Sequence, residues 1–106
     1  MSRFGLYGKI TVQPGQREAM AAVLLEAARL LQDDPQCELY LVNASESEPD
    51  VIWVTEVWAS REAHSAALAR DDVRALIQRG GPLIAGGERV DVVPLGGKGL
   101  ADPGGN

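Results

Sequence analysis

One histidine and one glutamate are the residues of this chain whose types and surroundings point to acid–base chemistry. His64 is the only histidine, and imidazole is the side chain whose ordinary pKa lies nearest to neutral pH. Glu56 lies in the apolar run VIWVTEVW, where a carboxylate must be paired or hydrogen-bonded. His64 is therefore a candidate general base, with a helix histidine bonded to a backbone carbonyl as the alternative. Glu56 is either a structural partner of an arginine or of backbone amides, or a base with a raised pKa.

Three aromatic side chains could form the walls of a site for a flat ring. Trp53, Trp58 and Tyr40 belong to two segments rich in β-branched and aromatic residues. Offset stacking adds roughly 0.5–1.5 kcal/mol to the burial of aromatic area. Because Trp53 and Trp58 are separated by an odd number of positions, they point to opposite faces of a strand. We expect one to line a cavity and the other to pack at a dimer interface, with core packing as the alternative for each.

Other common kinds of site have no motif in this sequence. The chain contains no G-x-G-x-x-G run, no G-x-x-x-x-G-K-[ST] run and no His or Cys cluster with the spacing of metal ligands. A net charge of -5 without clustered Lys or Arg argues against a nucleic-acid partner. The single cysteine, Cys37, cannot form an internal disulfide, which suits a reducing compartment. We therefore expect no metal, no cofactor, no membrane segment and a cytoplasmic location.

The apolar pattern predicts the elements that must position these side chains. Apolar residues alternate in the predicted strands and recur every three or four positions in the predicted helices. The elements are a strand over 4–12, a helix over 16–34, strands over 37–44 and 51–58, a helical region over 61–79 and a strand over 89–95. This β-α-β-β-α-β order predicts an α+β, ferredoxin-like sandwich: a four-stranded antiparallel sheet with the helices on one face and the first and third strands central.

The chain divides into a domain and a tail. Residues 1–95 carry the periodic pattern and form one domain, and 96–106 form a glycine-rich tail without periodicity. Within the domain the third strand is apolar on both faces, but helices can cover only one of them. The other face would expose a patch larger than monomers usually tolerate, and covering it is worth several kcal/mol at about 25 cal/mol per Å². We expect a homodimer with sheet against sheet, the alternative being a cover of loops and tail.

The run from GKITVQPGQREAM, through the hairpin, to TEVWASREAHSAALARDDVRAL resembles the antibiotic biosynthesis monooxygenase family. The resemblance covers roughly residues 4–95. It rests on a strand, Pro14-Gly15 and a helix at the start, and on Glu56-x-Trp58 followed by Ser60 and an Ala-rich helix. It implies a dimeric α+β barrel. Several members are similar to cofactor-free oxygenases that oxidise quinols or polyketide aromatics, and others degrade haem.

Two family patterns are absent from this chain. Many members carry a histidine at the position of Ala67, whereas His64 lies one turn earlier. The positions that match the Asn, Trp and His of haem-degrading members are Gly8, Ala67 and Ile77. Glycine, alanine and isoleucine cannot replace the asparagine, tryptophan and iron-binding histidine of those members. Haem degradation is therefore not expected unless His64 serves as the iron ligand.

Together with these residues, the resemblance implies a cofactor-independent monooxygenase acting on a small aromatic or quinol-type substrate with molecular oxygen. His64 would remove a phenolic proton, and Trp58, Trp53, Tyr40 and Glu56 would contact the substrate. The alternative is a non-enzymatic dimeric barrel that binds a small hydrophobic metabolite or acts as a structural or interaction module. Alanine at position 67 makes that alternative serious.

Overall fold

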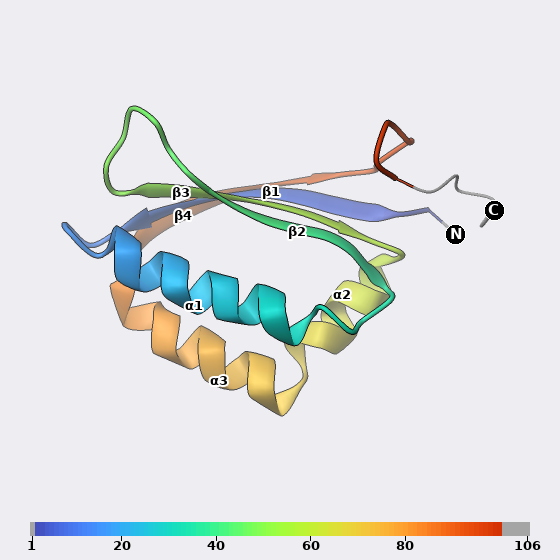
Figure 1. Cartoon of the computed structure of the whole chain (residues 1–106), viewed down its shortest axis with the longest axis horizontal. Helices are drawn as coiled ribbons and strands as arrows, with labels where there is room; N and C mark the ends of the chain where they lie inside the picture. Colours follow the sequence, from blue (N-terminus) through green and yellow to red (C-terminus); the bar gives the residue numbers. More distant parts are fainter. Residues whose placement is uncertain (1, 101–106) are drawn as a thin grey trace.

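Four strands form one sheet that is covered on one face by three helices (Figure 1). The computed structural model describes residues 2–100 of the 106-residue chain. The elements are β1 (Phe4–Val12), α1 (Arg17–Leu30), β2 (Cys37–Ala44), β3 (Val51–Trp58), α2 (Arg61–Leu68), α3 (Asp71–Gly80), a 3-10 turn (Gly81–Leu83) and β4 (Ile84–Val92). The predicted ferredoxin-like α+β fold is thus confirmed, with its second helical region split into α2 and α3. None of the described helices is long and apolar enough to cross a bilayer.

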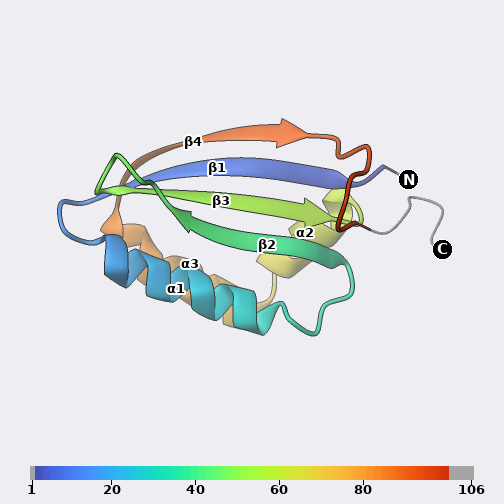
Figure 2. The same ribbon diagram turned by 45° about the horizontal axis from the view of Figure 1, so that its top comes forward.

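The sheet places β1 and β3 in its centre, as predicted. The strand order is β2-β3-β1-β4, and every neighbouring pair is antiparallel (Figure 2). Alternation along β3 turns Ile52, Val54 and Trp58 toward the helices, where all three are buried. Glu56 shares this face because residues two positions apart in a strand point the same way. The sheet therefore carries one carboxyl group on its helix-facing side in the middle of an apolar strand.

The last strand differs from the sequence-based expectation. β4 begins at Ile84 rather than at 89, and it ends at Val92 rather than at 95. After Ile84, its residues Ala-Gly-Gly have little intrinsic strand preference. Pairing with β1 orders them, since Ile84 lies opposite Val12 beyond an irregularity between Thr11 and Val12. Of the predicted tail, 101–106 lie outside the described residues.

Two clusters of buried side chains fill the space between the sheet and the helices. One contains Phe4, Leu6, Leu31, Trp58, Ala67 and Val73, and the other contains Val12, Met20, Ile52 and Val54. Tyr40 of β2 packs against both clusters. Helix α3 approaches α1 closely at Gly80, where a Cβ atom would lie 2.9 Å from Cε of Met20. These contacts hold α1 and α3 side by side over the sheet.

The opposite face of the sheet, here called the outer face, is largely apolar and has no helix over it (Figure 1). Its exposed large apolar side chains are Tyr7, Leu39, Leu41, Trp53 and Val90. The segment after β4 covers only one end: Pro94 packs over Gly5, where a Cβ atom would lie 2.9 Å from Pro94 Cγ. The alternative to a dimer, a cover formed by loops and tail, thus exists only at this end, and the centre of the outer face stays open.

Candidate functional site

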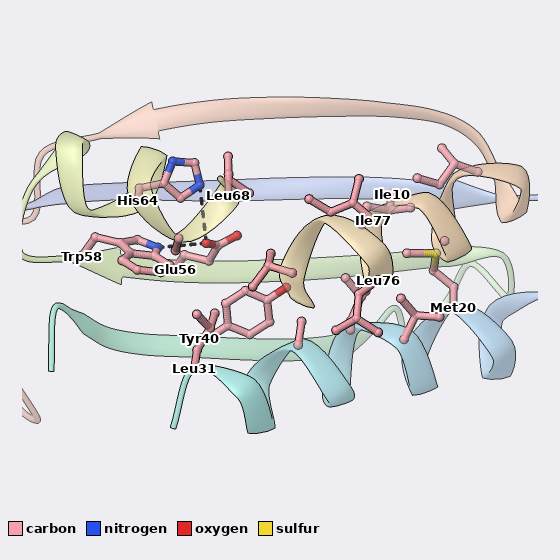
Figure 3. Close-up of a pocket in the computed structure, with 17 residues that line it drawn as sticks. Ile10, Met20, Leu31, Tyr40, Glu56, Trp58, His64, Leu68, Leu76 and Ile77 are labelled. Atoms are coloured by element: carbon pink, nitrogen blue, oxygen red, sulfur yellow. Dashed lines mark hydrogen bonds and ion pairs between the residues drawn. The ribbon is translucent and has the colours of Figure 1, made fainter. Parts of the chain in front are cut away.

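A cavity of about 200 Å³ lies between the sheet and the three helices (Figure 3). Its walls are mostly aliphatic side chains of α1, α3 and the sheet, and its polar groups come from Tyr40, Glu56 and His64. Leu68, Ile77 and Ile84 also line it and are 42%, 52% and 40% exposed. They therefore form an apolar rim where the cavity meets solvent. A concave, mostly apolar space with a few convergent polar groups is the usual form of a small-molecule site.

Glu56, Trp58 and His64 form one connected group at the α2 end of this cavity. The indole Nε1 of Trp58 donates a hydrogen bond of 2.9 Å to Oε1 of Glu56. His64 Nε2 lies 3.8 Å from the same oxygen (Figure 3). The His64 ring packs against Phe4 and edge-on against Trp58, with centroid distances of 5.1 Å and 5.5 Å. The imidazole is thus held by aromatic contacts on two sides, facing a carboxyl group that is largely buried.

The first turn of α2 explains how His64 reaches this position. Ser60 begins the helix, and its hydroxyl accepts a hydrogen bond of 3.1 Å from the backbone N–H of Ala63. Such a cap satisfies one of the free N–H groups at a helix start and fixes where the helix begins. His64 and Ala67, three residues apart, are both buried on the side of α2 that faces the sheet. His64, six positions after Trp58 in the sequence, therefore lies beside Glu56 in the fold.

Burial opposes charge on both members of the pair. Desolvation raises the pKa of Glu56, while the hydrogen bond from Trp58 and the positive charge of Arg89 act in the opposite direction. Desolvation also lowers the pKa of His64, and the nearby Arg89 lowers it further. The 3.8 Å approach is an ion pair only when His64 is protonated, and the pKa direction argues that it is neutral at neutral pH. A neutral imidazole can accept a proton, and a carboxylate beside it would stabilise the imidazolium formed.

Two nearby arginines further oppose protonation of His64. The guanidinium groups of Arg61 and Arg89 lie over the Phe4 ring, 4.3 Å and 5.6 Å from its centroid. Asp91 neutralises them in part, with oxygen atoms 3.4 Å from Arg61 and 2.6 Å from Arg89. Within this cluster Asp91 raises the pKa of His64, while both arginines lower it. Sequence inspection missed this cluster, because its members come from three separate elements.

The structure brings together four of the five site residues predicted from the sequence. His64, Trp58, Tyr40 and Glu56 all line the cavity. Trp53, predicted as a further substrate contact, lies on the outer face, is 40% exposed and has Nζ of Lys9 5.7 Å from its ring centroid. It cannot reach the cavity, because strand alternation turns it away from the helices. The prediction that the two tryptophans face opposite ways is confirmed.

Sequence reasoning did not find most of the aliphatic wall. Met20, Leu24, Leu76 and Ile77 contribute to it from α1 and α3, and the only sequence signal was the apolar stripe common to most packed helices. Ile84 lies in a segment that the sequence did not predict as a strand. An apolar stripe can either fill the space beneath its helix or leave a cavity there. The outcome depends on how the helices are positioned over the sheet, which the periodicity of the sequence does not indicate.

The described residues contain no obvious place for a metal ion or a reactive thiol. Across 2–100, no three His, Cys, Asp or Glu side chains converge as metal ligands. Burial, reinforced by the charge of Glu56, raises the pKa of Cys37 to about 11. Its thiol is therefore protonated and weakly nucleophilic at neutral pH.

Comparison with known proteins places this architecture among solved relatives. A candidate antibiotic biosynthesis monooxygenase from Chloroflexus aurantiacus J-10-fl is 44% identical, with a TM-score of 0.86 and coverage of 94% of this chain and 100% of that one. A second, from Caulobacter crescentus CB15, is 26% identical over 86% of this chain and 88% of that one, with a TM-score of 0.80. A third, from Deinococcus radiodurans, is 21% identical over 84% and 89% of the two chains, with a TM-score of 0.74, and shows the shared fold.

The family assignment rests on sequence as well as on structure. A search of curated proteins found no match. The family model described as antibiotic biosynthesis monooxygenase matches residues 3–79, a range that includes β1, the hairpin and all of the Glu56–Trp58–His64 group. This chain therefore belongs to the antibiotic biosynthesis monooxygenase family.

Proposed function

We propose that this protein is a cofactor-independent monooxygenase that oxidises a small aromatic or quinol-type substrate with molecular oxygen. The observation that carries the proposal is the buried pair at the end of the apolar cavity, with His64 Nε2 3.8 Å from Oε1 of Glu56. A general base acts best when it is neutral, close to the substrate proton and sheltered from water. His64 is 7% exposed and its pKa is lowered by burial and by Arg89, which supports a neutral imidazole that is sheltered from water.

The proposed reaction begins with removal of a proton. A phenolic hydroxyl placed beside His64 gives its proton to the imidazole, and Glu56 stabilises the resulting positive charge. The phenolate transfers an electron to dioxygen, and the two radicals combine so that one oxygen atom bonds to a ring carbon. The peroxide takes up the proton held by His64, the ring carbon that carries the peroxide loses its hydrogen as a proton, and the O–O bond breaks, so that the second oxygen atom leaves as water. For a quinol the products are a hydroxyquinone and one water molecule, and all the electrons that reduce dioxygen come from the substrate.

A non-enzymatic binding role is the second candidate. The cavity of about 200 Å³ is smaller than the roughly 300–1,000 Å³ typical of small-molecule sites, and Ala67 occupies the position where many family members carry a histidine. Both observations favour a protein that holds a small hydrophobic metabolite without changing it. The cavity is nevertheless edged by a base and a carboxyl group, which a purely apolar carrier does not need.

We also propose a homodimer in which the outer faces of two sheets pack together. The support is the open centre of the outer face, where Tyr7 is 48%, Leu41 is 47% and Trp53 is 40% exposed. Contiguous apolar side chains of this size on a sheet face favour association. A second copy related by a two-fold axis is the simplest partner, since the same patch then covers itself.

Oxygen consumption tests the catalytic proposal. Purified protein is mixed with a panel of quinols and anthrone-like phenols, and oxygen uptake is followed with an electrode from pH 5 to pH 9. We expect uptake with at least one compound, and a loss of about 10²–10⁴-fold in kcat for His64→Ala. Glu62→Ala, a change at an exposed position on the same helix, is the matched control. Turnover that His64→Ala leaves unchanged at every pH would refute the role of His64, and absence of uptake with the whole panel would favour the binding protein.

A further inference from the structure

Tyr40 brings a hydroxyl group into the cavity that no other described residue binds. The residue lines the cavity and is only partly exposed. Among residues 2–100, no backbone or side-chain group forms a hydrogen bond with its oxygen, although the oxygen is not sealed off from solvent-sized molecules. Buried polar groups are nearly always hydrogen-bonded in native proteins. A phenol hydroxyl that has no protein partner and lines an apolar cavity is available to a polar group of a molecule that enters the cavity.

The ring of Tyr40 is held firmly, so this hydroxyl has a defined place. Tyr40 packs against both buried clusters and lies directly opposite Glu56 in the β2–β3 pair. Figure 3 shows Glu56 and His64 at the α2 end of the pocket, Ile10 and Met20 toward the other end, and the Tyr40 ring beside Glu56, with its hydroxyl on the side toward the middle of the pocket. The cavity thus has two neighbouring polar positions: the Glu56–His64 pair at one end, and the Tyr40 hydroxyl beside it toward the middle of the cavity.

The protonation state of Tyr40 suits recognition better than proton transfer. Burial, reinforced by the charge of Glu56, raises the pKa of this phenol well above its ordinary value. The side chain therefore stays a hydroxyl at all physiological pH values. A hydroxyl can both donate and accept a hydrogen bond, so its partner can be an oxygen or a nitrogen atom.

The size of the cavity limits the molecule that could supply this partner. An engineered apolar cavity of about 150 Å³ takes up benzene. The cavity here, at about 200 Å³, has room for one ring with small substituents, whereas fused rings would have to extend past the rim. Its lining is otherwise apolar, so a ring that leaves either polar position without a partner is disfavoured.

We infer that Tyr40 is a specificity-determining residue whose hydroxyl binds a second oxygen or nitrogen substituent of a single-ring substrate, while Glu56 and His64 hold the reacting hydroxyl. The inference rests on the proposed function and deepens it by naming the substrate class. A ring with one hydroxyl can form hydrogen bonds only with the Glu56–His64 pair. A ring with two hydrogen-bonding substituents satisfies both polar positions, and a site built around such a hydrogen bond rejects analogues that lack it.

Binding in the absence of oxygen tests this inference directly. Isothermal titration calorimetry under nitrogen compares the three dihydroxybenzenes with the matching methylphenols, in which a methyl group replaces one hydroxyl at similar size. We expect the wild-type protein to bind at least one dihydroxybenzene about 10-fold more tightly than its methylphenol counterpart, as one hydrogen bond can supply. Tyr40→Phe should reduce that ratio to about 2-fold or less. Tyr7→Phe removes a hydroxyl from the outer face and should leave the ratio unchanged.

Three results would overturn the inference. They are a wild-type protein that binds none of the dihydroxybenzenes, an unchanged ratio in Tyr40→Phe, and tighter binding of 1,4-dihydroxynaphthalene than of every single-ring compound. Far-UV circular dichroism and thermal unfolding of Tyr40→Phe establish that the variant is folded.

Oxygen uptake by the same proteins separates this inference from the proposed function. A Tyr40-dependent preference without oxygen uptake would support Tyr40 as a recognition residue and refute the monooxygenase. Oxygen uptake whose KM ratio between dihydroxybenzenes and methylphenols is the same in wild type and Tyr40→Phe would support the monooxygenase and refute the role of Tyr40.

Discussion

The contributions of Trp58 and Glu56 to the free energy of unfolding should be coupled through their hydrogen bond. A double-mutant cycle can measure this coupling energy. Trp58 is 1% exposed and its Nε1 lies 2.9 Å from Oε1 of Glu56. Trp58→Phe leaves a buried carboxyl group without its donor, and Glu56→Leu leaves a buried indole N–H without its acceptor. Each buried polar group left unpaired costs about 1–3 kcal/mol. The double variant leaves neither group unpaired, so its loss of stability should be smaller than the sum of the single losses by about 1–3 kcal/mol.

Urea unfolding at one fixed protein concentration gives the free energies of unfolding for this cycle. Far-UV circular dichroism follows all four proteins, and the fluorescence of Trp53 remains as a second probe after Trp58 is replaced. The single variant Trp58→Phe also loses packing volume, but that loss occurs in the double variant as well and cancels in the cycle. A coupling below about 0.5 kcal/mol would show that the carboxyl group does not depend on the indole, and the structural basis of the site would be wrong.

Three further predictions concern charge and association. Because burial and Arg89 lower the pKa of His64, oxygen uptake should stay high below pH 6.5 and fall only at more acid pH; a fall centred above pH 6.5 in kcat/KM would contradict this. Burial raises the pKa of Glu56 above its unfolded value, so the native state binds more protons between the two values and stability should fall as pH rises through that window. Glu56→Gln should weaken this fall in urea unfolding between pH 4 and pH 8, and an identical pH dependence in both proteins would refute it. Trp53→Glu should convert a dimer to a monomer in sedimentation velocity at micromolar concentration, with Leu25→Glu on α1 (47% exposed) as the control; a monomeric wild-type protein would rule out the dimer.

Local patterns predicted most of the fold because each one reflects a nearby physical constraint. Alternation over 51–58 places Glu56 and Trp58 on one face and Trp53 on the other, whatever the strand packs against. Ser60 as a helix cap is equally local, since its hydroxyl and the N–H of Ala63 are three residues apart. The start of β4 escaped prediction, because Ile84 becomes a strand residue only through pairing with Val12.

The chain's own pattern of residues determined the order of elements, the placement of Glu56 and Trp58 on one face of their strand and Trp53 on the other, and the presence of a single histidine; only the tertiary structure showed that the helices cover the face of Glu56 and Trp58. Tertiary structure alone decided that His64 returns to within 3.8 Å of Glu56, that Arg89 lies close enough to lower its pKa, and that α1 and α3 leave a cavity of about 200 Å³ over Tyr40. The reason is one of range: periodicity and capping act between residues a few positions apart, whereas a cavity and its electrostatics depend on how surfaces distant in sequence meet.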